Sequence, residues 1–281
     1  MDRPSGTTAA GSGPIGVFDS GIGGLSVLAA IKAVLPEEKL VYVADQAHIP
    51  YGERSLTEVR AFSMAITQAL VDRGCKLVVI ACNTASAAAL EPLRSSYPAM
   101  RFVGMEPAVK PAAEQSTAGV VGVLATSATF QGELFASVVE RFAQGVQVLK
   151  QPCPGLVEQI EAGEVASPRT ETMLRGWIGP MLARGIDALV LACTHYPFVR
   201  PLIERIAGPG VRVIDPAPAI ARQVQRVLGE MNALAQPGSE GGTVHYTSGD
   251  TMAFLALAGR LAMPVGDVRP ASWSDDRLIL G

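Results

Sequence analysis

The sequence predicts an α/β protein with two related, doubly wound lobes, mainly parallel sheets and a pseudo-twofold relation between the lobes. Three observations predict this fold class. Short apolar runs alternate with longer stretches of helical period. The short runs are apolar throughout, as is typical of strands buried on both faces in parallel sheets. Finally, several motifs of the first half return in the second half in the same order.

The strands are predicted from near-continuous apolar runs of four to seven residues. The predicted strands are 15–18, 39–44, 76–81, 101–105, 119–125, 146–149, 187–192 and 211–214.

The clearest helix is predicted over 55–74. Ser55 and Glu58 form a capping-box pattern at its start, and Gly74 is a typical residue just beyond a helix end. Helical spacing of apolar residues also predicts helices over 23–36, 222–235 and 252–262.

An internal repeat favours two lobes over one. Three pairs of motifs match in register. A single match among apolar strands could arise by chance, but three matches in the same order are better explained by two related halves. Ligands of open α/β sheets bind beyond the carboxyl ends of the strands, so we expect the active site in the cleft between the lobes. The pairs are "GVFDSG" (16–21) with "GVLATS" (122–127), "ACNT" (81–84) with "ACTH" (192–195), and "EPA" (106–108) with "DPA" (215–217).

Composition narrows the function classes. The chain has 281 residues, 48% of them hydrophobic, and a formal net charge of -3 without a basic cluster, which argues against a nucleic-acid partner. No apolar run approaches the roughly 20 residues of a membrane span. Residues 1–13 are rich in Gly, Ser, Thr and Pro and lack the apolar core of a signal peptide. We therefore expect a flexible leader there and a cytoplasmic protein.

Two of the four cysteines occupy matching positions. Cys82 and Cys193 each end a predicted strand and precede a predicted helix. A helix N-terminus stabilises a thiolate, so we expect thiol pKa values below the usual value of about 8.5. Two facing thiolates would repel, which predicts one shared proton. The alternative is that a buried cysteine is only a small apolar side chain, the interpretation we adopt for Cys75 and Cys153.

A thiol on each side of one pocket suits racemisation, because one group removes a proton from a carbon and the other returns a proton to the opposite face. Asn83, Thr84, Thr194 and His195 stand beside the cysteines and could hold a carboxylate and an ammonium group.

The segment "DSGIGG" (19–24) opens a helix but does not match a nucleotide-binding loop. Asp19 could serve as a carboxylate near Cys82, as a partner for a substrate ammonium, or only as a helix cap. Tyr51 and Gly52 form a turn that could line a polar pocket. No lysine stands where a pyridoxal phosphate enzyme would need one, and no His/Cys cluster indicates a metal, so no cofactor and no metal are expected.

Five motifs of this sequence resemble those of the bacterial glutamate racemase family. Members of this family are amino-acid racemases that use two cysteines and no cofactor. The resemblance runs from about residue 15 to about 265. It implies interconversion of L- and D-glutamate, which supplies D-glutamate for peptidoglycan. The motifs that carry it are "GVFDSGIGG", "VADQAHIPYG", "VIACNTAS", "GVLATSAT" and "VLACTHYP".

The resemblance also implies roles for individual residues. Cys82 and Cys193 correspond to the two catalytic acid/bases, and Glu158 resembles an acidic residue behind the second thiol. Asp19 and His195 would also assist the proton transfers. The positions that match substrate contacts are Asp19, Ser20, Tyr51, Gly52, Asn83, Thr84, Thr194 and His195.

The family fold implies that the chain crosses twice between the lobes. A first lobe of 14–105 with 217–267 and a second lobe of 106–216 are expected, whereas the tail 268–281 has no counterpart. Two alternatives stay open: a racemase of another substrate, of the aspartate or hydantoin type, and a DNA gyrase-binding role beside catalysis. The expected partner is glutamate, and a homodimer is one option for the assembly.

Overall fold

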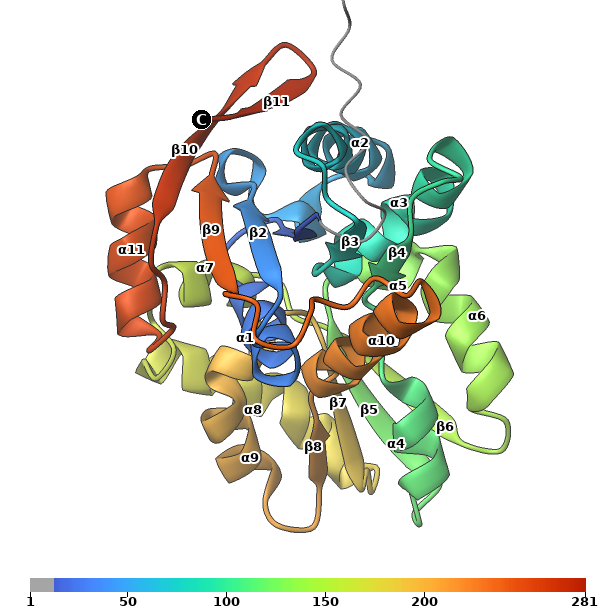
Figure 1. Cartoon of the computed structure of the whole chain (residues 1–281). Coiled ribbons are helices and arrows are strands. Elements are labelled where there is room, and N and C mark those ends of the chain that lie inside the picture. The colour runs from blue at the N-terminus through green and yellow to red at the C-terminus, as the bar shows by residue number, and fades with distance from the viewer. Residues whose placement is uncertain (1–12) are drawn as a thin grey trace, which may run out of the picture.

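The protein folds into two parallel sheets, each covered by helices on both faces (Figure 1). The computed structural model describes residues 13–281, so the predicted leader lies outside the described residues except for Gly13. Within the described part, no helix has the length and apolar character needed to cross a membrane. The α/β fold class with two sheets is confirmed.

The first sheet has seven strands in the order β11-β10-β9-β2-β1-β3-β4. Neighbouring strands are parallel except for β10 and β11, which form an antiparallel hairpin at the end of the chain. The strands are β1 (Ile15–Asp19), β2 (Lys39–Ala44), β3 (Leu77–Ile80), β4 (Phe102–Gly104), β9 (Gly242–Thr247), β10 (Val268–Ser274) and β11 (Arg277–Leu280).

The second sheet repeats the core of the first. Its order, β6-β5-β7-β8, corresponds strand for strand to β2-β1-β3-β4, as the repeated motifs predict. All eight predicted strands are present, whereas β9, β10 and β11 were not predicted because their sequences mix polar residues and a proline with apolar ones. The strands are β5 (Val120–Ala125), β6 (Gln147–Pro152), β7 (Ala188–Ala192) and β8 (Arg212–Ile214).

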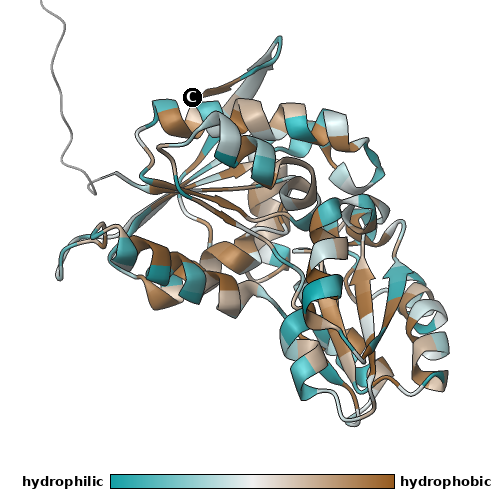
Figure 2. Cartoon of the chain, turned by 90° about the vertical axis from the view of Figure 1, so that its right-hand side faces the viewer, coloured by the Kyte–Doolittle hydropathy of each residue, from teal (hydrophilic) through white to brown (hydrophobic). Residues whose placement is uncertain are grey.

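Four helix layers bury the two sheets, and the strands carry the apolar residues at the middle of each lobe (Figure 2). Helices α1 (Leu25–Val34), α10 (Ala217–Glu230) and α11 (Thr251–Arg260) cover one face of the first sheet, and α2 (Leu56–Asp72) and α3 (Asn83–Ser96) cover the other. On the second sheet, α7 (Leu156–Glu161), α8 (Pro168–Ala183) and α9 (Arg200–Ala207) face α4 (Val109–Gln115) and α6 (Glu133–Phe142) across the strands.

The predicted capping box is present at the start of α2. The Ser55 hydroxyl accepts from the Glu58 amide at 3.2 Å, and the Glu58 carboxylate accepts from the Ser55 amide at 3.0 Å. Gly74 follows the helix with a positive φ of 76°. Helix α10 begins earlier than predicted, directly after Pro216, and its C-terminal residue is Glu230.

The predicted domain limits can be compared with the sheets. The strands of the first sheet come from 15–104 and 242–280, and those of the second sheet come from 120–214. The predicted tail, 268–281, contains β10 and β11 and pairs with β9. The exact limits of the lobes stay a prediction.

A buried ion pair holds the amino-terminal edge of the first sheet. Lys76, directly before β3, places Nζ 2.7 Å from the Glu38 carboxylate, and their side chains are only 7% and 3% exposed. Lys76 also donates to the Ala233 carbonyl, and Glu38 accepts from the Ala235 amide. The pair therefore ties the segment after α10 to the sheet.

Replacing Lys76 by methionine should leave the Glu38 carboxylate buried without its cation. We expect the free energy of unfolding, measured in urea, to fall by about 3 to 5 kcal/mol. The matched control is Arg226→Met, which breaks the exposed pair with Glu230 and should cost less than about 1 kcal/mol. Equal effects of the two substitutions would contradict this account.

Candidate active site

The carboxyl ends of the central strands meet at a cavity between the lobes. Asp19 ends β1 and Cys82 follows β3, while Cys193 follows the equivalent strand β7. These are the points where the strand order reverses, at which α/β sheets bind ligands. The small cavity is lined by Ser20, Pro50, Tyr51, Gly52, Cys82, Asn83, Thr84, Thr126, Val157, Cys193, Thr194 and His195.

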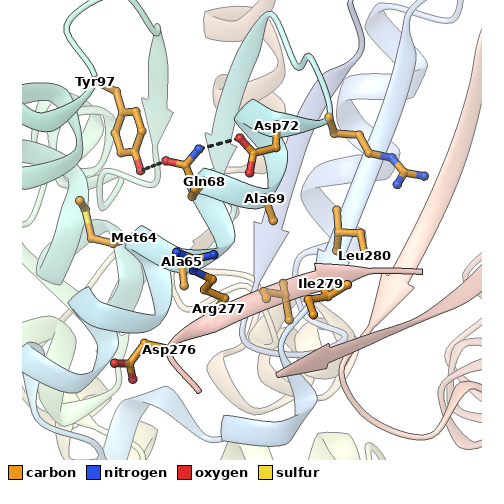
Figure 3. A pocket seen from close by; sticks show the side chains of 12 residues that line it. Met64, Ala65, Gln68, Ala69, Asp72, Tyr97, Asp276, Arg277, Ile279 and Leu280 are labelled. Carbon is orange, nitrogen blue, oxygen red and sulfur yellow. Dashed lines mark hydrogen bonds between the residues drawn. The ribbon is translucent and has the colours of Figure 1, made fainter. Parts of the chain in front are cut away.

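A larger and more open groove lies elsewhere, between α2 and β11 (Figure 3). Along it, Tyr97 donates to Gln68, which donates to Asp72. This groove is open and holds no thiol or histidine. The smaller cavity is therefore the better candidate site, because titratable and nucleophilic groups converge there.

Cys82 lies next to Asp19 in the first lobe. The thiol lies near the buried Asp19 carboxylate, and its sulfur accepts from the Ala85 amide at 3.4 Å as the N-cap of α3. Burial and the negative charge of Asp19 raise the pKa of Cys82 well above its ordinary value. The expected lowering by the helix N-terminus is therefore wrong for Cys82, because desolvation of a buried thiolate outweighs the helix dipole.

Asp19 joins the two lobes. Its carboxylate accepts from the Gly24 amide at 2.8 Å and, across the cleft, from the Thr194 hydroxyl at 3.3 Å. Burial raises the pKa of Asp19, although the charge of His195 and the amide hydrogen bonds oppose that effect.

Cys193 has a different partner, His195. Its sulfur lies 3.9 Å from Nδ1 of His195, and Nε2 of the same ring lies 2.7 Å from the Glu161 carboxylate. Burial alone would lower the pKa of His195, but the hydrogen bonds and charges of Cys193 and Glu161 outweigh it and raise the pKa well above its ordinary value. The ring is therefore held as an imidazolium between a sulfur and a carboxylate.

Glu161 is the residue that the sequence did not single out. Besides His195, it accepts from the Ile22 amide at 2.9 Å and from the Gln46 amide group at 3.4 Å. Hydrogen bonds and the charge of His195 keep its pKa low despite burial. Glu158, predicted as the acidic residue behind the second thiol, lines an adjacent small cavity with Glu53 and Cys153. Nothing local in "LVEQIEAGE" distinguishes the two glutamates.

The glycine-rich segment packs tightly against the second lobe. A Cβ on Gly23 would lie 2.4 Å from the His195 ring, so no larger residue fits there. The backbone passes so close to His195 that position 23 requires glycine, and no phosphate ligand is needed to explain this residue.

Polar groups between the lobes complete the cavity. The hydroxyls of Thr84, Thr126 and Thr129 lie 2.9 to 3.2 Å from one another, which links α3 to the segment after β5. The Asn83 side chain is buried and neither its oxygen nor its nitrogen has a partner. A buried amide without partners costs stability, which indicates a group that waits for a ligand.

The two remaining cysteines, Cys75 and Cys153, do not line this cavity. Burial raises the pKa of Cys75 to about 12 and also raises the pKa of Cys153. Among the described residues, no group of three or more His, Cys, Asp or Glu side chains could hold a metal ion.

Comparison with known proteins agrees with this geometry. The family model described as Asp/Glu/Hydantoin racemase matches residues 16–224. The glutamate racemase of Ectopseudomonas mendocina is 50% identical over 244 residues, which cover 87% of this chain and 92% of that protein. A glutamate racemase of Pseudomonas putida is 52% identical over 246 residues, or 88% of this chain and 92% of that protein.

Solved structures show the same fold. Glutamate racemase from Thermus thermophilus, in complex with β-chloro-D-alanine, has a TM-score of 0.81 and 37% identity and covers 92% of this chain and 97% of its own. The Escherichia coli enzyme, in complex with L-glutamate and the activator UDP-MurNAc-Ala, has a TM-score of 0.80 and 29% identity over 92% of this chain and 98% of its own. The chain therefore belongs to the Asp/Glu/Hydantoin racemase family.

Proposed function

We propose that Cys82 and Cys193 perform a two-base racemisation in which the chain interconverts L- and D-glutamate and so supplies D-glutamate for peptidoglycan. One observation carries the proposal: two thiols, from equivalent strand ends of two related lobes, line the same cavity. The relatives at about 50% identity are glutamate racemases over most of the chain's length, which supports glutamate as the substrate.

The reaction needs one thiolate and one thiol at a time. The thiolate takes the proton from Cα of the substrate, and the electron pair left on that carbon delocalises into the carboxyl group. The thiol on the opposite side then donates its proton to the other face of Cα. One carbon–hydrogen bond breaks and one forms, so the enantiomer changes and the proton state of the two cysteines is exchanged.

The surroundings of the thiols suit such an exchange. Burial and Asp19 favour the neutral thiol at Cys82, so Cys82 holds a proton in the free protein. The imidazolium of His195 lies beside the Cys193 sulfur and can stabilise negative charge or deliver a proton there. Glu161 keeps the ring charged and oriented.

The remaining cavity residues are proposed to bind the substrate. The unpaired amide of Asn83 offers both a donor and an acceptor, and the hydroxyls of Ser20, Thr84 and Thr194 lie around the same space. Tyr51 and Gly52 close the cavity from the first lobe. Glu158, a homodimer and a cytoplasmic location remain predictions beside this proposal.

The thiols can be tested by following optical rotation and loss of the Cα proton in heavy water, without added cofactor, with L-glutamate and L-aspartate in parallel. We expect racemisation of glutamate alone, and Cys82→Ala and Cys193→Ala should each lower kcat/KM at least about 100-fold. Cys75→Ala is the control, since Cys75 lies in the core behind α2 and should retain activity. Racemisation by both variants at the wild-type rate would rule out the mechanism. Rapid turnover of aspartate would overturn the assignment of glutamate as the substrate.

The His195–Glu161 pair predicts a pH dependence of stability. Because the folded-state pKa of His195 lies above its ordinary value of 6.5, protonation stabilises the fold fully below about 6.5 and less as pH rises through the folded pKa. The difference in Tm between wild type and His195→Gln should therefore be largest below about pH 6.5 and shrink as the pH rises through the folded-state pKa.

His245 supplies the control for that measurement. Burial lowers its pKa from 6.5, so its neutral form stabilises the fold above about 6.5 and this contribution is lost as the pH falls. The Tm difference for His245→Gln should change with pH in the opposite direction. Parallel slopes for the two variants would contradict the assignment of charge to His195.

A further inference from the structure

A second buried carboxylate lies beside the cavity and has no role in the proton transfers. Asp45 directly follows β2, is fully buried and has four side-chain partners. The Tyr51 hydroxyl donates to Oδ2 at 2.6 Å, and Nδ1 of His48 lies 2.9 Å from the same oxygen. The Ser248 hydroxyl and the Trp273 indole N–H both donate to Oδ1 at 2.8 Å.

The two oxygens face different parts of the chain. Oδ1 is held by donors from the C-terminal part of the chain, Ser248 after β9 and Trp273 in β10. Oδ2 faces the segment that contributes to the cavity. Because a carboxylate is planar and rigid, donors that fix Oδ1 also fix the direction in which Oδ2 faces Tyr51.

Tyr51 begins a short 3₁₀ turn, η2 (Tyr51–Glu53), which closes the cavity on the side of the first lobe. The next residue, Gly52, lies so close to the second lobe that an added Cβ would stand 2.7 Å from the Thr126 side chain. The position of η2 therefore sets the shape of the cavity on this side, and it also sets the contact between Gly52 and Thr126 of the two lobes.

Aromatic contacts fix the position of the Trp273 ring, whose N–H donates to Asp45. Its ring meets His48 edge to face at 4.8 Å between centroids and meets Phe62 of α2 at 5.8 Å. The His48 ring in turn stacks on Phe62 at 3.8 Å. Trp273 pairs with Leu278 in the hairpin of β10 and β11, so the indole stands on a paired part of the strand.

We infer that Asp45 and Trp273 are positioning residues for the active site: the indole N–H of the C-terminal hairpin orients the Asp45 carboxylate, which holds Tyr51 and η2 against the cavity. This inference rests on the proposed function in so far as Tyr51 contacts the substrate. It gives the segment 268–281, which has no counterpart in the motifs of the family resemblance, a part in substrate binding.

Trp273→Phe tests the inference because it removes the N–H and retains an aromatic ring. We expect KM for L-glutamate to rise about fivefold, the equivalent of one net hydrogen bond, with kcat within about twofold of wild type. Ser248→Ala removes the other donor to Oδ1 and should act in the same direction. Trp177→Phe, in α8 of the other lobe, is the matched control and should leave KM unchanged.

A double-mutant cycle separates positioning from general stability. In the Tyr51→Phe background, which lacks the hydroxyl that Asp45 holds, Trp273→Phe should have no further effect on KM. Additive effects of the two substitutions, or an unchanged KM in Trp273→Phe, would overturn the inference.

A measurement that does not depend on activity completes the test. Amide hydrogen exchange of residues 49–54 should be faster in Trp273→Phe than in wild type and Trp177→Phe, because η2 loses its anchor. If wild type does not racemise glutamate but this exchange is faster, the proposed substrate fails and the positioning stands. Unchanged exchange would overturn the positioning whatever the substrate.

Discussion

The buried carboxylate of Asp19 is the constraint on which the active site depends. A charge in this position is costly unless it is surrounded by donors, and its donors come from every part of the cleft. The Gly21 and Gly24 amides, in the loop after β1, donate to it from the first lobe, and the Thr194 hydroxyl donates from the second lobe. Satisfying one carboxylate therefore also sets the distance between the lobes at the site.

The lobes share a strand order but give their thiols different chemistry. Cys82 faces a carboxylate, whereas Cys193 faces an imidazolium that a carboxylate holds in place. Groups of one chemical type whose environments differ in this way can serve as acid and base in the same site. The twofold framework brings the two sulfurs to one cavity, and the asymmetry of Asp19 and His195 keeps both from ionising together.

Local signals in the sequence predicted much of this structure, and long-range contacts account for the rest. Eight strands follow from uninterrupted apolar runs, and α2 follows from its capping box. The positions of Cys82 and Cys193 follow from the repeat, because equivalent strand ends meet at one cleft. The contact of Glu161 with His195 could not be predicted, since three nearby glutamates look alike until α7 is folded. The pKa of Cys82 was wrongly predicted because its burial is a tertiary property.

The lobes also differ at the residue that follows β2 in one and β6 in the other. Asp45 and Cys153 are equivalent, because the amide of each donates to the end of the central strand, at Asp19 and Ala125. The first lobe has three additional strands beyond β2, and these bring Ser248 and Trp273 to the Asp45 carboxylate. The second sheet ends at β6, and its equivalent position carries a neutral thiol. Of these two equivalent positions, a buried carboxylate thus occupies only the one in the lobe whose extra strands supply the donors that it needs.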